Sequence, residues 1–279
     1  MEHSMIPIRR AIAANYANLP HGSPTRRGFL RFFGKRAARP GAFFCRECMS
    51  ADVDFHGVSY WRREHQVPGH FWCPKHSTPL MFMEKREAFL QAPSKFSSLA
   101  RTVPGEWFGD ALNNSCVGRF IEIMSGLMER ERPMHVKHVT LALRTQAVGR
   151  GLHTSRRLVR KPLLSDLILD SYPRNWLDSV LPDFVKKTRG EILQSVDEVL
   201  VLHNSVWPVS SYVAAAAVLY GSADEALNKM FQTSQTYGKA SKLHPLSLSM
   251  LDNGVSASAC AGSLGFTSLT DRRLTDQSH

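Results

Sequence analysis

The sequence has no apolar run of about eighteen residues, the length at which a membrane-spanning helix becomes a candidate. Its first residues include Arg9 and Arg10, but the continuous apolar stretch of a secretory signal does not follow them. A Walker-type phosphate loop, a Gly-x-Ser-x-Gly elbow and a His-Glu-x-x-His helix are also missing. We therefore expect a cytoplasmic protein that is not an enzyme.

Cysteine is scarce: the chain has five, an odd number, and three of them lie between residues 45 and 73. A disulfide framework would need an oxidising compartment, which nothing in the sequence indicates. Metal binding is the better interpretation of the clustered cysteines. Cys116 and Cys260 are interpreted as plain thiols.

Positive charge is in excess, with a formal net charge of +11, and it is segregated along the chain. Residues 1–40 carry eight basic side chains and one acidic, and residues 130–161 carry nine and one. Residues 162–232 reverse the sign, with nine acidic and five basic side chains. Such segregation is typical of a protein that binds a polyanion, because basic side chains that neutralise phosphates release counterions. A soluble basic protein without such a partner is the alternative.

The spacing of apolar residues predicts a mainly α protein, with strand-like patterning only near the cysteines. The expected helices cover 4–18, a short basic stretch after Pro24, 110–130, 135–148, a segment that begins at Pro162, 209–220 and 222–231. Residues 233–279 are rich in small polar residues and cannot bury enough apolar area to offset the entropy of ordering. We therefore predict a disordered tail there.

Two residue pairs, Cys45-x-x-Cys48 and Cys73-x-x-His76, have the spacing of zinc ligands. Zinc prefers four tetrahedral thiolate or imidazole ligands, and four protein ligands leave no position for a reactive water. Residues 40–83 are otherwise too irregular to form a core without an ion. These residues therefore predict one structural Zn²⁺ in a small zinc-ribbon or knuckle module. The alternatives are ordinary buried cysteines, or one ligand replaced by His56, His65 or His70.

The segment 60–70 between the ligand pairs is rich in aromatic, basic and histidine residues. Tyr60 and Trp61 are expected to pack on the module and supply the apolar area that it lacks. Arg62 and Arg63, with their polar neighbours, could face phosphates or could bond the module to adjacent helices. We favour the second, structural role.

Residues 44–48, 60–69, 73–76 and 79–80 resemble the TniQ family, and residues 163–177 resemble the segment that follows TniQ in TnsD-like proteins. Such proteins select target sites for transposons. The resemblance implies a protein that binds double-stranded DNA and hands the target to a TnsC-like AAA+ ATPase. It also assigns the zinc-ligand role to Cys45, Cys48, Cys73 and His76. The chain is shorter at both ends than is usual for the family, as a truncated copy would be.

These observations predict three parts: a TniQ-like region at 1–83 with the zinc module at about 40–83, a helical TnsD-like region at 84–232, and the tail. Helix 135–148, the basic stretch after it and the helix from Pro162 could form a helix-turn-helix-like unit. Its alternative is a solvated basic linker. Arginine suits bidentate phosphate or guanine contacts. The candidate DNA contacts are Arg144, Arg150, Arg156, Arg157, Arg160 and Lys161.

The leading hypothesis is a nucleoid-associated, zinc-stabilised adaptor of transposition that binds DNA, has no membrane partner and could be a homodimer. The second is a zinc-module protein that bridges other proteins, with incidental DNA contacts. The third is a nuclease or other catalytic zinc protein. Asp52 and Asp54 lie close together in the sequence, but no distant carboxylate partner for a two-metal site is apparent.

Overall fold

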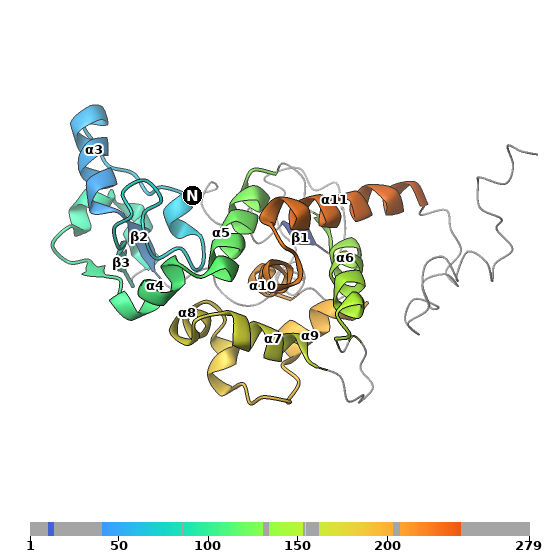
Figure 1. The fold of residues 1–279 in the computed structure, drawn as a ribbon. Helices are drawn as coiled ribbons and strands as arrows, with labels where there is room; N and C mark the ends of the chain where they lie inside the picture. Colours follow the sequence, from blue (N-terminus) through green and yellow to red (C-terminus); the bar gives the residue numbers. More distant parts are fainter. Residues whose placement is uncertain are drawn as a thin grey trace, which may run out of the picture. The chain divides into compact units, whose positions relative to one another are not determined.

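The computed structural model describes residues 11–13, 41–84, 86–130, 134–152, 154, 162–202 and 207–240. Within these ranges the chain is mainly helical, as predicted, and it contains two small sheets (Figure 1). The strands are β1 (Ile12–Ala13), β2 (Ala42–Phe44), β3 (Met81–Met83), β4 (Arg101–Thr102) and β5 (Met134–His135). The α-helices are α3 (Arg46–His56), α4 (Gly105–Leu112), α5 (Ser115–Met128), α6 (Val136–Gly149), α7 (Leu164–Ser171), α8 (Arg174–Val180), α9 (Gln194–Asp197), α10 (Val209–Leu219) and α11 (Ala223–Ala240).

Short 3-10 helices connect these elements: η1 (Glu64–Gln66), η2 (Arg86–Leu90), η3 (Pro93–Phe96), η4 (Pro182–Lys186) and η5 (Glu198–Leu200). Residues 1–234 form one compact unit, to which all the elements except the end of α11 belong. Among the described residues, no helix has the length and apolar composition needed to cross a membrane.

A three-stranded antiparallel sheet, in the order β2-β3-β4, is the base of what we call the cysteine module, residues 41–103. Phe43 pairs with Phe82 across β2 and β3, and the two rings stack with centroids 5.7 Å apart. Helix α3 follows β2 directly and extends away from the sheet (Figure 1). The strand patterning expected near the cysteines is therefore confirmed.

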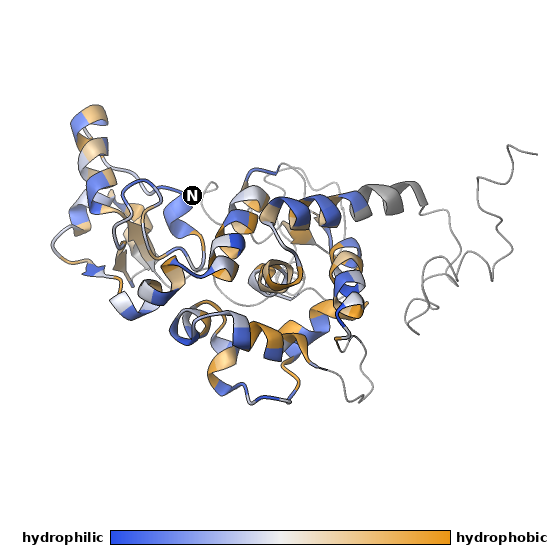
Figure 2. Cartoon of the chain, in the orientation of Figure 1, coloured by the Kyte–Doolittle hydropathy of each residue, from blue (hydrophilic) through white to orange (hydrophobic). Residues whose placement is uncertain are grey.

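Helix α10 is the centre of the helical part, where it packs on α5, α6, α7 and α9. The four alanines 214–217 are fully buried, and their small side chains let neighbouring helices approach closely. Figure 2 shows the contrast between hydrophobic α10 and the more hydrophilic α11. The core thus surrounds a helix that the sequence predicted as the alanine-rich stretch 209–220.

Trp176 on α8 joins the cysteine module to the helical part. Its side chain is fully buried, stacks on Tyr172 and meets Phe120 edge-on, with ring centroids 5.1 Å away in both cases. Its indole Nε1 donates a hydrogen bond to the Gly69 carbonyl at 2.9 Å. Gly69 has φ +83°, and a Cβ there would lie 2.5 Å from the Trp176 ring. Only glycine satisfies both the left-handed backbone and this close approach.

We predict that Gly69→Ala destabilises the chain more than Gly190→Ala. Gly190 has the same φ of +83° but open space around its missing Cβ. Gly190→Ala should therefore cost only the left-handed strain, about 1–2 kcal/mol. Gly69→Ala should add overpacking against Trp176, about 1–3 kcal/mol more. Denaturant unfolding of the two variants measures the difference, and equal losses would contradict the close contact.

The first described segment is a strand, and the helix predicted over 4–18 is wrong at that point. Ile12 and Ala13 form β1, which pairs in parallel with Met134 and His135 of β5. Ile12 is fully buried, and the Met134 amide donates to the Ala11 carbonyl at 2.6 Å. The tertiary partner thus overrides a helix-like spacing of apolar residues. The rest of 4–18 and the basic stretch after Pro24 lie outside the described residues.

Two other boundaries differ from the predictions. The helix expected over 110–130 is divided into α4 and α5, because the Asn114 side chain accepts hydrogen bonds from the amides of Cys116 and Val117 and caps the start of α5. Helix α11 continues to Ala240, past residue 233, where the disordered tail was predicted to begin. Residues 241–279 lie outside the described part. Helix α6 confirms the helix predicted over 135–148.

Helix α6 carries a partly buried histidine, His138, and the folded state disfavours its protonated, charged form. Burial, and secondly the charge of His135, lower the pKa of His138 to about 4. An unfolded histidine titrates near about 6.5, so the folded state binds fewer protons between these values. The stability from neutral His138 is complete above the unfolded pKa and is lost as the pH falls through the folded pKa.

We therefore predict that His138→Gln weakens the fall in melting temperature between pH 7 and pH 4. His56→Gln, which changes an exposed histidine on α3, is the matched control and should keep the wild-type profile. Thermal unfolding across this pH range is the measurement. A His138→Gln profile parallel to that of the wild type would argue against the buried neutral imidazole.

Candidate metal centre

The first pair of predicted ligands lies where β2 leads into α3. Cys45 is the N-cap of α3, with an extended backbone, and Cys48 is in its first turn. Both side chains are buried. The change from strand to helix turns the two sulfurs toward the same side of the chain, so the two-residue gap brings them together as the spacing predicted.

The second pair lies on a tight turn between His70 and β3. The Ser77 amide donates to the Cys73 carbonyl, and the Cys73 amide donates to the Thr78 carbonyl, both at 2.8 Å. Ser77 has φ +54°, a left-handed conformation that is uncommon for a residue with a Cβ. This closed turn holds Cys73 and His76 on the side that faces α3.

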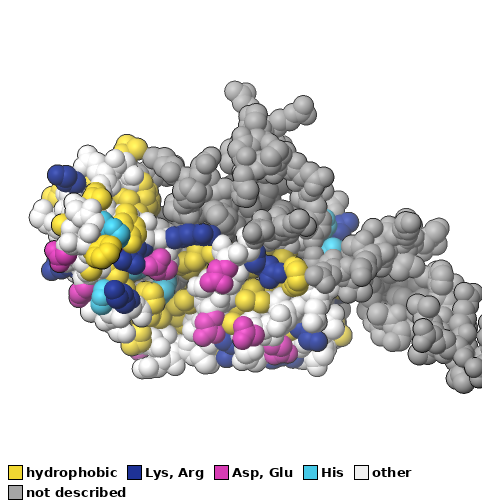
Figure 3. Space-filling model, turned by 90° about the horizontal axis from the view of Figure 1, so that it is seen from above, with side chains coloured by type: hydrophobic (Ala, Val, Ile, Leu, Met, Phe, Trp, Pro, Cys, Tyr) yellow, Lys and Arg dark blue, Asp and Glu magenta, His cyan; other side chains and the backbone are white. Residues whose placement is uncertain are grey.

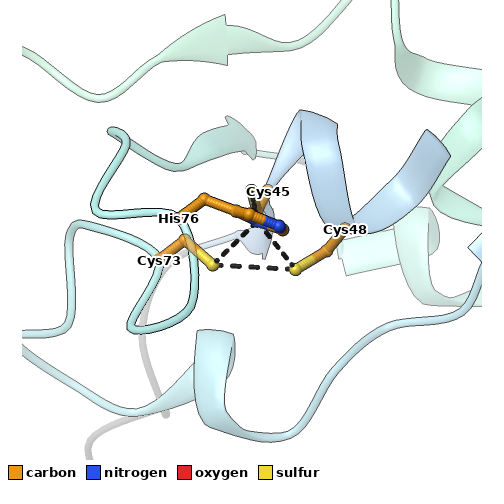
Figure 4. A group of neighbouring side chains, drawn as sticks. All are labelled: Cys45, Cys48, Cys73 and His76. Carbon is orange, nitrogen blue, oxygen red and sulfur yellow. Dashed lines mark hydrogen bonds between the residues drawn. The ribbon is translucent and has the colours of Figure 1, made fainter. Parts of the chain in front are cut away.

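The four predicted ligands converge, with their ligand atoms all within 4.8 Å of one another (Figure 4). His76 Nδ1 lies 3.3 Å from Cys45 Sγ, 3.4 Å from Cys48 Sγ and 3.6 Å from Cys73 Sγ. Cys48 Sγ and Cys73 Sγ are 3.6 Å apart. Tetrahedral zinc, with bonds of about 2.0–2.3 Å, needs ligand atoms separated by roughly 3.3–3.8 Å. The donor set, its burial and its spacing are compatible with one metal ion.

The protonation of the thiols depends on what occupies this centre. Burial, followed by a hydrogen bond with Cys73, raises the pKa of Cys48 to about 12. Burial also raises the pKa of Cys45. Without a cation Cys45 and Cys48 therefore hold their protons, and a bound cation must displace them. A divalent cation held by three thiolates and one neutral imidazole would then balance two of the three negative charges and leave the site with a net charge of −1.

Two neighbours of Cys45 were not predicted. Glu47 Oε2 is 2.9 Å from Cys45 Sγ and accepts a hydrogen bond from Thr78 Oγ1 at 3.1 Å. Thr78 Oγ1 is itself 3.6 Å from Cys45 Sγ. The sequence feature that could have indicated this contact is the position of Glu47 between Cys45 and Cys48. Such polar neighbours orient ligands that would otherwise rotate.

The alternative histidine ligands do not join the cluster that the structure describes. His65 and His70 are buried elsewhere in the module, and His70 Nδ1 lies 3.1 Å from the Glu64 carbonyl oxygen. His56, at the end of α3, has its ring edge-on to Phe55. His76 is therefore the histidine of the four-residue group.

The segment between the ligand pairs has the structural role that we favoured. Trp61 packs against Phe44, Phe89 and Phe96, and its Nε1 donates to the Gln91 carbonyl at 2.7 Å. Tyr60 is more exposed, at 46%.

The polar residues of this segment also point inward. Arg63 donates to the Met128 carbonyl at the end of α5, at 2.5 Å. The Gln66 amide bonds both backbone groups of Phe43 in β2. Arg62 is paired with Asp52.

The candidate DNA contacts fall into two groups. Arg144 is 6% exposed and donates to the carbonyls of Thr154 and Leu200, while Arg150 donates to the carbonyls of Val218 and Leu219. Both guanidinium groups therefore donate to backbone carbonyls within the protein, three of which belong to the ends of η5 and α10. The other four candidates lie outside the described residues: Arg156, Arg157, Arg160 and Lys161.

The TniQ family model matches residues 1–80 of the chain, a span that contains all four clustered ligands. No curated protein matches the chain. The family match confirms the resemblance drawn from the motifs, and residues 1–80 are a TniQ-family segment. The family indicates a transposition-associated protein. The likeness of residues 163–177 to TnsD-like proteins stays a prediction.

We predict that Cys48→Ala abolishes stoichiometric zinc binding and that Cys116→Ala leaves it intact. Structural zinc contributes about 10–16 kcal/mol in small zinc-finger peptides, comparable to the roughly 5–15 kcal/mol that holds a whole domain folded. The Cys48→Ala variant, or the wild type treated with a chelator, should therefore lose the structure of the cysteine module.

Elemental analysis for zinc and near-ultraviolet circular dichroism of the module's tryptophans measure these outcomes. Cys116 is a free buried cysteine on α5, outside the cluster, so its variant controls for the loss of a thiol. Equal zinc content in both variants would contradict the assignment of Cys48 as a ligand.

Proposed function

We propose that this chain is a DNA-binding adaptor of transposition whose TniQ segment folds around one structural zinc ion. The observation that carries this proposal is the Cys₃His cluster inside the segment that matches the TniQ family. All four positions are filled by protein side chains, so the ion would hold the fold and would not expose a site for water. An adaptor without catalytic chemistry is consistent with this arrangement.

Charge distribution supports a DNA surface outside the cysteine module. Residues 41–103 have eight basic and six acidic side chains, close to balance. Figure 3 shows both charge signs, histidine and hydrophobic side chains interspersed over the part where α3 lies. The two strongly basic stretches are residues 1–40 and 130–161. Strand β1 belongs to the first and β5 to the second, so their pairing joins the two basic stretches at one point of each.

The proposed DNA contacts are Arg156, Arg157, Arg160 and Lys161, between α6 and α7. A helix-turn-helix-like reading of α6 and α7 is part of this proposal. Arg150 is exposed and its guanidinium has N–H donors beyond the two that bind carbonyls, so it stays among the proposed contacts. The burial of Arg144 excludes Arg144 from the proposed surface. Phosphate contacts of this kind position a protein on duplex DNA without reading its sequence.

The proposal extends to partners by way of the family. A transposon AAA+ ATPase would receive the target that the chain marks, and the acid-rich stretch 162–232 is the surface we assign to a protein partner. A nucleoid-associated location and a homodimer belong to the same proposal.

A second function, protein bridging by the cysteine module, is favoured by one observation. The end of α3 exposes a group of large apolar side chains: Phe55 is 84% exposed, Val58 55% and Val53 38%. Exposed apolar patches often mark protein interaction sites. In this reading the module recruits proteins and DNA contacts are incidental.

We predict that Arg156→Ala, Arg157→Ala and Arg160→Ala together weaken DNA binding and flatten its salt dependence. Each neutralised phosphate contributes about 0.9 to the slope of log affinity against log salt concentration, so loss of three contacts should reduce the slope by up to about 2.7. Fluorescence anisotropy with a labelled duplex at several salt concentrations measures the slope.

The control replaces three exposed basic residues of the acid-rich stretch: Lys186→Ala, Arg189→Ala and Lys229→Ala. It removes the same charge and should leave the slope close to that of the wild type. Equal slopes in all three proteins would exclude the stretch after α6 from the DNA surface. Undetectable DNA binding by a folded, zinc-loaded wild type would favour the bridging function.

A further inference from the structure

Two arginines from different helices meet at the C-terminal end of α10. Arg119 on α5 donates from Nε to the Ala217 carbonyl at 2.8 Å. Arg150, which follows α6 directly, donates from Nη1 to the Val218 carbonyl at 2.9 Å and from Nη2 to the Leu219 carbonyl at 2.8 Å. The last carbonyls of a helix have no partner within it, so these bonds satisfy them. Because the three carbonyls are consecutive, the two guanidinium groups lie close together.

The helical core holds both arginines in place. Helix α10 packs on α5 and on α6 (Figure 1). Tyr220, which is 3% exposed, ties the end of α10 to α6 by donating to the Ala142 carbonyl at 3.0 Å. Arg119 also donates from Nη2 to Cys116 Sγ, one turn earlier on α5, at 3.1 Å. The side-chain entropy that a free arginine loses on binding a ligand is therefore largely lost already in the folded protein.

The positive charge at this helix end is not matched by a carboxylate. Among the described residues, the hydrogen-bond partners of the two arginines are three backbone carbonyls and one cysteine sulfur. Glu225, at the start of α11, accepts a hydrogen bond from the Gly221 amide at 3.1 Å instead. A helix C-terminus carries roughly half a negative charge. Two guanidinium groups at one such end therefore keep most of their charge uncompensated, and they are expected to attract an anion.

Both arginines also keep hydrogen-bond donors for a ligand. A guanidinium has more N–H groups than the two that each arginine uses here. Arg150 is exposed and Arg119 is partly exposed. Planar N–H groups of this kind fit the paired oxygens of a phosphate. Arg150 is in the basic stretch 130–161, so the pair lies where that stretch leaves the helical core.

We propose that Arg119 and Arg150 form a binding site for a phosphate of the DNA backbone, in which the end of α10 positions both guanidinium groups. This inference rests on the proposed DNA-binding function. It extends that function by a contact on α5, outside both basic stretches of the sequence, and by a described anchor for the DNA surface. The alternative is that the two arginines only cap α10.

The test measures how DNA affinity depends on salt in Arg119→Gln and in the double variant with Arg150→Gln. Glutamine keeps an N–H donor for the helix end but has no charge, so it separates the phosphate contact from the cap. The slope of log affinity against log salt concentration should fall by about 0.9 in the single variant and by about 1.8 in the double variant. Fluorescence anisotropy with a labelled duplex gives the slope.

The matched control is the double variant Arg174→Gln with Arg189→Gln. It removes the same charge from two arginines that already have carboxylate partners, Asp178 and Asp170. Arg174 also donates to two backbone carbonyls, as Arg150 does. The control should therefore keep the wild-type slope.

A second measurement uses the wild type and decides the question even if the glutamine variants fold poorly. Phenylglyoxal modifies arginine side chains, and mass spectrometry locates the modified positions. Duplex DNA should protect Arg119 and Arg150 from modification and leave the reactivity of Arg174 unchanged. Inorganic phosphate is added in a parallel sample to separate a DNA phosphate from a free one.

A wild-type slope in the double variant, or unchanged reactivity of Arg119 and Arg150 in the presence of DNA, would overturn the phosphate site while leaving DNA binding elsewhere on the chain intact. Protection by inorganic phosphate but not by DNA would overturn it as well, in favour of a small phosphorylated ligand. A folded, zinc-loaded wild type that binds no DNA would overturn the proposed function together with this inference.

Discussion

The convergence of three cysteine sulfurs and one imidazole nitrogen within 4.8 Å is the constraint on which the N-terminal part of the structure depends. Those four atoms come from the start of α3 and from the turn before β3, so whatever holds them fixes both segments. Among the described residues, the module contributes Phe43, Val67, Phe71 and Leu80 to the main core, and its own separate cluster of buried apolar residues is small: Ala42, Met83 and Ala88. A separate cluster of that size stabilises little, and the proposed cation would add to it.

Several polar groups of the segment 60–70 make hydrogen bonds within the protein, and this shapes the functional interpretation. Arg63 binds the end of α5, Gln66 bonds the backbone of β2, and Gly69 accepts a hydrogen bond from Trp176. Arg63 and Gly69, through these hydrogen bonds, hold the module against the helices, and Gln66 bonds one part of the module to another. Recognition of a nucleic acid is therefore better assigned to the stretches 1–40 and 130–161, where the sequence concentrates charge.

Local patterns made parts of this structure predictable, and contacts between distant segments made other parts unpredictable. The ligand set followed from two short spacings, and α6 and α10 followed from apolar periodicity. Strand β1 has two residues and pairs with β5, which lies more than a hundred residues later, so no local period could reveal it. Asp52 was considered only as a possible catalytic carboxylate. Its pairing with Arg62 depends on how α3 meets the next segment, which the sequence does not encode locally.

The strand order of the small sheet shows that the segment matched by the family model and the folding unit have different limits. The family match ends at residue 80, immediately before β3, which is the central strand between β2 and β4. A fragment cut at that limit would keep every candidate metal ligand and yet remove β3, so β2 would lose its paired strand and keep only the hydrogen bonds between Gln66 and the backbone of Phe43. It would also lose the indole that covers Gly69. Excision of a usable fragment would therefore have to extend through α8.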